Sequence, residues 1–379
     1  MTSRLPLRDF SLALALLAIC AFFAIRVPGW SFLSARNLSL LMIDFSITAT
    51  LAIGMLLVIL PGHIDLSAGS GLGLIGGIAA VLITNQHWSA PLAMLTGLGV
   101  ALVLWWAMGN LIVRQRIPAF IITLGGLLVF KGLFWLVIHN HTIPIVPGGQ
   151  QNLYSLLTTY YLSPVAGYVI AALVIAGLIF TRLKSRAARK SYGFEIDDGE
   201  VTFLKLFLAA QVIVLFVLVT NQFRGVPLPA LILGAVALAV WVLTQHTPWG
   251  RYLYAIGGNE EAAIISGIPV ERVTIGAFTL MGAIVALTGY MQTAYGGSST
   301  TTVGDLMELD AVAACVIGGV SLKGGRGSVL GVLCGALIMA CLLNGMSLLA
   351  VEPEKKYIAR GAVLILAVWM DVRLSRRGV

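Results

Sequence analysis

The sequence contains few charged residues. Aspartate, glutamate, lysine and arginine make up 11% of the 379 residues, whereas hydrophobic residues make up 59%. Soluble domains carry about 25% charged residues, so this composition excludes an ordinary soluble fold. The apolar residues form many runs of roughly 20, which is the length that a helix needs to cross a bilayer. A segment in lipid must satisfy its own backbone hydrogen bonds, so such runs indicate helices.

The sequence also lacks the motifs of common catalytic and metal centres. No GxxxxGK[ST] P-loop occurs, which excludes ATP hydrolysis of the P-loop type by this chain. No HExxH, CxxC or GxSxG motif is present. The four cysteines lie in apolar runs without metal-ligand spacing. We therefore predict that the chain is not an enzyme and holds no metal or cofactor of its own.

The apolar runs predict an all-α polytopic membrane protein with about twelve spans. The expected spans are 10–26, 40–60, 67–84, 91–113, 118–138, 163–181, 203–220, 227–245, 273–294, 305–322, 328–350 and 357–371. With both termini in the cytoplasm, most of the 24 lysine and arginine residues fall in cytoplasmic loops, as the positive-inside rule requires. Topology therefore explains the net charge of +8, and no nucleic-acid partner is expected.

A weak internal repeat is visible. LGLIGGIAA in the third expected span resembles ACVIGGVSL in the tenth, and the acid-bearing segments HIDLS and GDLMELD precede them. Gly-interrupted segments at matching places in inverted halves mark the substrate path of many transporters. We therefore expect one transmembrane domain over residues 1–379, with 40–138 and 273–371 as its inverted halves. Further spans occupy 163–245 and carry a cytoplasmic insert at 182–202.

The stretch LPGHIDLSAGSGLGLIGG, residues 60–77, places a helix breaker, an acid and six glycines between two expected spans. Irregular backbone is tolerated at membrane depth only where it is buried or lines a cavity. The letters GLGLIG match the dinucleotide fingerprint, but no soluble strand precedes them, so packing is the favoured interpretation. Gly69, Gly73 and Gly77 fall on one helix face, where they would let neighbouring helices approach closely.

Several polar residues lie in or beside the expected spans. Asp65 and Ser67 could cap the third span, in which case asparagine should replace Asp65 with little loss, or they could gate the path. Charges inside spans are functional candidates by default, although Lys131 could instead snorkel to the interface. The candidate residues of the translocation path are Asp44, Asp65, Ser67, Gly69, Gly73, Gly76, Lys131, Asp310, Gly318 and Gly319.

The loop 246–272 contains the sequence of a short amphipathic helix. An asparagine suited to the N-cap is followed by two acids in the first turn, and a glycine and a proline follow the last turn. Such a helix could lie on the bilayer surface or be held by a soluble partner. The candidate coupling residues are Asn259, Glu260, Glu261, Ala262, Ala263 and Gly267.

These motifs together resemble the permease subunits of bacterial sugar ABC importers, in the branched-chain amino acid, ribose and galactose permease superfamily. The resemblance is carried by GGNEEAAIISGI, IDLSAGS, RIPAFIITLGG and ACVIGGVSLKGGRGSVLGVLCGALIMA, and covers residues 36–138 and 246–375. It is closest to the xylose type, which has the extra spans around 163–245 and an ending like WMDVRLSRR. A single glutamate before the alanines is more usual than the Glu260-Glu261 pair found here.

The resemblance implies a type II ABC importer-like fold, with ten core spans and an extra pair, in the bacterial inner membrane. It also implies three protein partners: a second copy of this chain, a cytoplasmic ABC ATPase and a periplasmic sugar-binding protein. The ATPase, usually two fused domains in one polypeptide, would bind ATP and Mg²⁺. The loop 246–272 would couple the ATPase to the membrane helices, and the outer loop 139–162 would lie near the binding protein.

We therefore expect a permease subunit that moves a monosaccharide, D-xylose or a related pentose, with specificity resting largely on the binding protein. One alternative is a proton-coupled secondary sugar transporter. That mechanism needs a titrating carboxylate in the membrane, and Asp44 is the only good candidate. Another alternative is a membrane scaffold that transports nothing.

Overall fold

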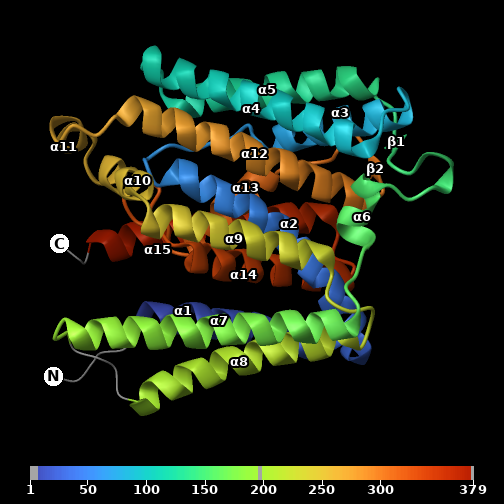
Figure 1. Ribbon diagram of the computed structural model, residues 1–379. Helices are drawn as coiled ribbons and strands as arrows, with labels where there is room; N and C mark the ends of the chain where they lie inside the picture. The colour runs from blue at the N-terminus through green and yellow to red at the C-terminus, as the bar shows by residue number, and fades with distance from the viewer. Residues whose placement is uncertain (1–6, 195–198, 377–379) are drawn as a thin grey trace.

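The computed structural model describes residues 7–194 and 199–376, and its regular structure is almost entirely helical (Figure 1). The helices are α1 (Leu7–Arg26), α2 (Ala35–Ile59), α3 (Ala68–Thr84), α4 (Ala90–Arg114), α5 (Ala119–Ile138), α6 (Leu153–Thr159), α7 (Pro164–Ser191), α8 (Gly199–Asn221), α9 (Leu228–His246), α10 (Pro248–Gly258), α11 (Glu260–Ile265), α12 (Val270–Gly296), α13 (Met307–Ile317), α14 (Val329–Leu348) and α15 (Pro353–Arg376). Two 3-10 turns, η1 (Pro28–Leu33) and η2 (Pro147–Gly149), and two short strands, β1 (Ile143–Pro144) and β2 (Ser298–Ser299), complete the elements. Of the expected insert 182–202, residues 195–198 lie outside the described part.

Eight helices of the described chain are long and apolar enough to cross a membrane. They are α2, α4, α5, α7, α8, α9, α12 and α14. Shorter apolar helices cover Leu12–Arg26 within α1, and α3. The expectation of a polytopic all-α membrane protein is therefore confirmed, whereas the count of about twelve crossings stays a prediction.

The helix expected over 305–322 is the clearest error of the sequence analysis. The chain is helical there only over Met307–Ile317, 11 residues that rise about 16 Å, roughly half of the hydrocarbon thickness. Leu306 has a left-handed backbone with φ +61°, and Gly304 and Gly319 also have positive φ values. These conformations end the helix on both sides, so α13 cannot cross the bilayer alone.

Two long helices form the centre of the bundle. In α2, 83% of the most apolar 18-residue window is buried within the protein, and in α12 the share is 67%. For α7 and α8 it is 11% and 6%, and these helices lie together at the side of the bundle opposite α4 and α5 (Figure 1). Because each of α7 and α8 contains an 18-residue stretch that is strongly apolar, the exposed faces of these stretches suit contact with lipid.

The packing partners of the two halves correspond to each other. In the first half, α3 packs against α4 and α5, and in the second, α13 packs against α14 and α15. Between the halves, α12 packs against α3 and α4, and α2 packs against α13 and α14. Exchanging α2–α5 with α12–α15 thus reproduces the same helix pairs.

Both short helices of these halves follow an irregular segment. Residues 60–67 precede α3, and residues 297–306 precede α13. The second segment is held by antiparallel pairing of β2 with β1, which lies in the loop after α5. The pairing and α6 lie at one end of the bundle, whereas α10 and α11 lie at the other (Figure 1).

Candidate translocation and coupling sites

Asp65 lies at the centre of a buried hydrogen-bond group at the start of α3. Its Oδ1 accepts hydrogen bonds from the backbone N–H of Ser67 at 2.8 Å and from the Ser67 hydroxyl at 2.6 Å. Its Oδ2 accepts a hydrogen bond from the indole Nε1–H of Trp105 in α4 at 2.6 Å. Asp65 and Ser67 are both fully buried. The side chain of Asp65 therefore ties the segment entering α3 to α4.

This arrangement corrects the interpretation of Asp65 as a helix cap. The N-cap residue of α3 is Ser67, and its side chain forms no capping hydrogen bond. Asp65 instead binds the N–H of the N-cap residue itself and reaches across to another helix. The donors around it fit a carboxylate, which can only accept hydrogen bonds when ionised.

The glycines of α3 are buried on every side of the helix. A β-carbon at Gly69 would overlap the carboxylate of Glu308 and lie 2.6 Å from the carbonyl oxygen of Gly304. At Gly73 it would lie 2.6 Å from the carbonyl oxygen of Val303, and at Gly76 it would overlap α12. The expectation that these glycines permit close packing is met by this geometry. The irregular segment 297–306 supplies the closest neighbour at Gly73 and the closest backbone neighbour at Gly69.

The start of α13 brings carboxylates into the interior of the bundle. The side chain of Glu308 is 5% exposed and lies against Gly69 of α3. Asp310 Oδ2 lies 3.3 Å from Arg360 of α15, and its Oδ1 has no hydrogen-bond partner among the described residues. Arg360, which falls within the expected span 357–371, is within the third turn of α15. Asp310 is therefore held by an arginine of α15.

Lys131 holds the segment before α13 from the other side. Its ammonium group forms an ion pair with Asp305 and donates a hydrogen bond to the carbonyl oxygen of Thr301 at 2.9 Å. It also lies 5.6 Å from the ring centre of Trp135. The charge of Lys131 is therefore paired within this chain, while the side chains of Lys131 and Asp305 stay 23% and 42% exposed.

The remaining candidate path residues lie apart from this group. Asp44 of α2 lies near the hydroxyl of Tyr295, close to the end of α12. Gly318 follows α13 and packs directly on the backbone of Gly331 in α14, and Gly319 forms the turn after it with φ +85°. The structure thus brings Asp65, Ser67, Gly69, Gly73, Lys131 and Asp310 to the α3–α13 region. It places Asp44, Gly76, Gly318 and Gly319 around this region.

The helix expected in the loop 246–272 is present as α11. The side chain of Asn259 caps it by accepting a hydrogen bond from the N–H of Ala262 at 2.9 Å. Ala263 packs inward at 4% exposure, and Gly267 ends the turn with φ +77°. Glu260 and Glu261 are exposed, and so are the apolar side chains of two neighbours: Ile264 is 57% and Ile265 87% exposed.

Three backbone segments meet beneath α11. The carbonyl oxygen of Leu60, just after α2, accepts a hydrogen bond from the N–H of Gly325 at 2.9 Å. Gly257, near the end of α10, packs so tightly on both that a β-carbon there would overlap the Leu60 carbonyl. A displacement of α10 and α11 would therefore also displace the segments that lead into α3 and α14, because the backbones are in direct contact.

The sequence identified the buried acids of the site but not the residues that contact them. Trp105 and Arg360 each sit in an apolar run, where nothing marks a tryptophan or an arginine as the partner of a distant acid. Gly257 and Gly325 lie in glycine pairs, and only the folded chain shows that they touch the same carbonyl group. A cation inside an expected span was the one usable signal, and it applied to Arg360, which lies in the expected span 357–371.

Comparison with known proteins finds relatives that cover nearly the whole chain. Residues 37–368 match the family described as the permease component of the branched-chain amino acid transport system. The xylose transport system permease protein XylH of Haemophilus influenzae is 37% identical over 376 residues, covering 98% of each chain. XylH of Escherichia coli is 38% identical over 378 residues, covering 98% of this chain and 94% of that protein. The ribose import permease protein RbsC of Bacillus subtilis is 33% identical over 345 residues, 91% of this chain and 87% of that protein. No solved structure matches the chain.

Proposed function

This chain belongs to the permease family of the branched-chain amino acid transport systems, and we propose that it is the permease subunit of an ATP-driven importer of D-xylose or a related pentose. The observation that carries the proposal is the identity of 37–38% to two xylose permeases over 98% of the chain. The ribose permease aligns with a smaller share of the chain, at lower identity.

In this function the chain is one multi-pass domain of the bacterial inner membrane with both termini in the cytoplasm. The ends of α4 and α10 and the helix α11 then face the cytoplasm, in agreement with the basic residues there. Residues 40–138 and 273–371 form the inverted halves. The matching helix pairs of α2–α5 and α12–α15 support this repeat, as do the irregular segments that precede α3 and α13.

The substrate path opens where α3 meets the segment before α13. Support comes from the polar groups that this contact places in the bundle interior: Asp65, Glu308 and Asp310. Carboxylates accept hydrogen bonds from hydroxyl groups, the groups that a monosaccharide presents in greatest number. Glu308 lies against Gly69, so separation of the two segments would uncover its carboxylate.

The helix α11 couples this chain to a cytoplasmic ABC ATPase of two fused domains. The isoleucines exposed beside its two acids support a protein partner, since exposed apolar side chains rimmed by charge are typical of interaction sites. ATP and Mg²⁺ bind to that partner and not to this chain. A second copy of the chain completes the membrane unit, and a periplasmic sugar-binding protein delivers the sugar near residues 139–162.

The test is uptake of labelled D-xylose into vesicles that contain this chain, its ATPase and its binding protein. We expect uptake that requires ATP on the side of the membrane that holds the ATPase and that survives a protonophore. A protonophore that abolishes uptake, with no requirement for ATP, would instead support the proton-coupled alternative. Parallel assays with ribose and with ribose-binding protein show whether the pentose preference resides in this chain.

A further inference from the structure

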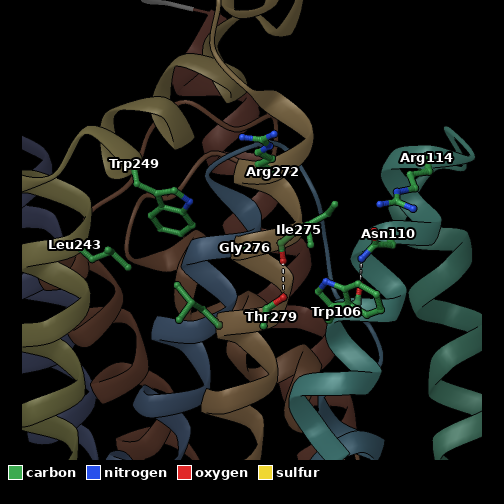
Figure 2. Close-up of a pocket in the computed structure, with 10 residues that line it drawn as sticks. Trp106, Asn110, Arg114, Leu243, Trp249, Arg272, Ile275, Gly276 and Thr279 are labelled. Carbon is green, nitrogen blue, oxygen red and sulfur yellow. Dashed lines mark hydrogen bonds between the residues drawn. The ribbon is translucent and has the colours of Figure 1, made fainter. Parts of the chain in front are cut away.

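A groove at the basic end of the bundle has no role in sugar transport as described above. Its cavity volume is about 630 Å³, and α4, α12 and the junction of α9 with α10 form its walls (Figure 2). α4 contributes Trp106, Asn110 and Arg114, and α10 contributes Trp249. α12 contributes Arg272 and Thr279 among others. The groove thus joins three helices that are far apart in the sequence.

Two arginines lie at one end of the groove. Arg114 is in the last turn of α4 and Arg272 is in the first turn of α12, and both are exposed. Figure 2 shows them at the same level, on opposite sides of the opening. Neither forms an ion pair within residues 7–194 and 199–376, and no acidic residue lines the groove. Glu271 precedes Arg272 in the first turn of α12 but does not line the groove, so the two arginines are the charged side chains of its lining.

Below the arginines the groove presents mainly carbon. The indole rings of Trp106 and Trp249 form opposite sides of it (Figure 2). The polar side chains at this depth are bonded within their own helices. Asn110 Nδ2 donates to the carbonyl oxygen of Trp106 at 2.7 Å, and Thr279 Oγ1 donates to that of Ile275 at 2.8 Å. Trp106 is 52% exposed, so the apolar part opens towards the lipid-facing surface.

The spacing suits a molecule with an anionic head and an apolar chain. Trp106 and Arg114 are eight residues apart on α4, which is about 12 Å along a helix. Arginines between transmembrane helices at the cytoplasmic side commonly bind anionic lipid headgroups. We propose that this groove binds an anionic phospholipid of the inner leaflet. Its phosphate lies between Arg114 and Arg272, and an acyl chain runs past Trp106 and Thr279.

This site goes beyond the proposed transport function and shares with it only the orientation of the chain. A lipid in the groove touches α4, α10 and α12 at once. Trp249 of α10 packs against Gly276 of α12, where a β-carbon would lie 3.3 Å from the indole nitrogen. Since α10 leads directly into α11, the lipid would brace the base of the coupling helix.

The experiment is native mass spectrometry of the purified full chain, titrated with phosphatidylglycerol or phosphatidylcholine of identical acyl chains. We expect the wild-type chain to bind phosphatidylglycerol more tightly. Each arginine near the membrane surface strengthens binding of an anionic lipid by about fivefold, so Arg114→Gln with Arg272→Gln should weaken it about 25-fold. Phosphatidylcholine binding should change little.

The matched control combines Arg116→Gln with Arg182→Gln, two exposed arginines at the same end that do not line the groove. It removes the same charge and should leave phosphatidylglycerol binding unchanged. Thr279→Trp fills the groove without altering charge and should weaken binding of both lipids. The Thr279→Trp variant also tests the proposal if the arginine double variant does not purify as a monodisperse protein.

Three outcomes would overturn the proposal. The first is equal affinity of the wild-type chain for the two lipids, which would show an apolar groove without headgroup recognition. The second is a double arginine variant that binds phosphatidylglycerol as well as the control does. The third is a Thr279→Trp variant that loses its dimeric mass and keeps its lipid, which would assign the groove to a contact between two copies of the chain.

Discussion

Replacing Asp65 by asparagine keeps the number of heavy atoms in the side chain but removes one hydrogen-bond acceptor. The carboxylate accepts from two donors of Ser67 at one oxygen and from Trp105 Nε1–H at the other. If the amide oxygen of asparagine faces Ser67, its NH₂ group meets the indole N–H, donor against donor. If the amide is flipped, the NH₂ group meets the backbone N–H of Ser67. One buried N–H group loses its partner in either case.

The expected cost follows from the burial of these groups. Asp65, Ser67 and Trp105 are all fully buried, so no water replaces the missing acceptor. A hydrogen bond to a charged group contributes about 1.5–3 kcal/mol, and leaving a buried donor unpaired costs about 1–3 kcal/mol. We therefore expect Asp65→Asn to lower the free energy of unfolding by about 2 kcal/mol or more. The sequence-based view of Asp65 as a cap predicts almost no loss, because asparagine and aspartate cap helices about equally well.

A double-mutant cycle with Trp105→Phe isolates the contact. Phenylalanine keeps an aromatic ring and lacks the N–H group, so the asparagine in the double variant can face Ser67 with its oxygen and meet no opposing donor. We expect a coupling energy of about 1–2 kcal/mol between the two positions, within the range found for residues in one hydrogen-bond network. Unfolding of the purified chain in mixed detergent micelles, followed by circular dichroism, gives the four free energies.

Asp44→Asn is the control for this cycle. Its neighbour, the Tyr295 hydroxyl, can donate or accept, so asparagine should be tolerated at position 44 with a loss below about 1 kcal/mol. The reasoning is refuted if Asp65→Asn costs as much in the Trp105→Phe background as it does in the native chain. Vesicle uptake adds a second readout. A loss of transport in Asp65→Asn that exceeds the loss of folded protein would assign the charge of Asp65 to gating.

Three further substitutions test the packing, the coupling helix and the ion pair. Gly73→Leu should reduce the yield of folded, assembled protein, because overpacking a fitted contact costs about 1–3 kcal/mol. Gly99→Leu should be tolerated, because a β-carbon at Gly99 meets open space. The yield of each variant from size-exclusion chromatography is the measurement. Glu261→Arg should abolish ATPase stimulation by sugar-loaded binding protein while the chain still inserts in the membrane, and normal sugar uptake would contradict the role of α11. Lys131→Met removes the ion pair and should speed amide hydrogen exchange in residues 297–306; unchanged exchange would show that β-pairing alone holds this segment.

The sequence predicted helices well wherever an apolar run ends in polar residues. The span expected at 91–113 is α4 at Ala90–Arg114, and the one expected at 227–245 is α9 at Leu228–His246. It failed at α13 because hydropathy does not report backbone conformation. Residues 311–320 are as apolar as a true span, yet Leu306 and Gly319 turn the chain with positive φ at each side. Only the packed neighbours hold a leucine in that left-handed conformation, so no local pattern reveals it.

The sequence also does not reveal which charged residues become neighbours in the fold. The positive-inside rule accounts for Arg114 and Arg272 only through the total number of basic residues in the cytoplasmic loops. That total does not show which residues lie next to each other in the fold. The fold adds that information because α4 and α12 are packed against each other. They run in opposite directions, since Gly97 lies beside Tyr290 and Gly109 beside Ile275. The last turn of one helix then lies beside the first turn of the other, and two arginines 158 positions apart in the sequence reach one groove. Asp310 and Arg360 meet for a similar reason, since α13 packs against α15. Helix packing thus decides which charges of a membrane protein act together, and composition decides only how many there are.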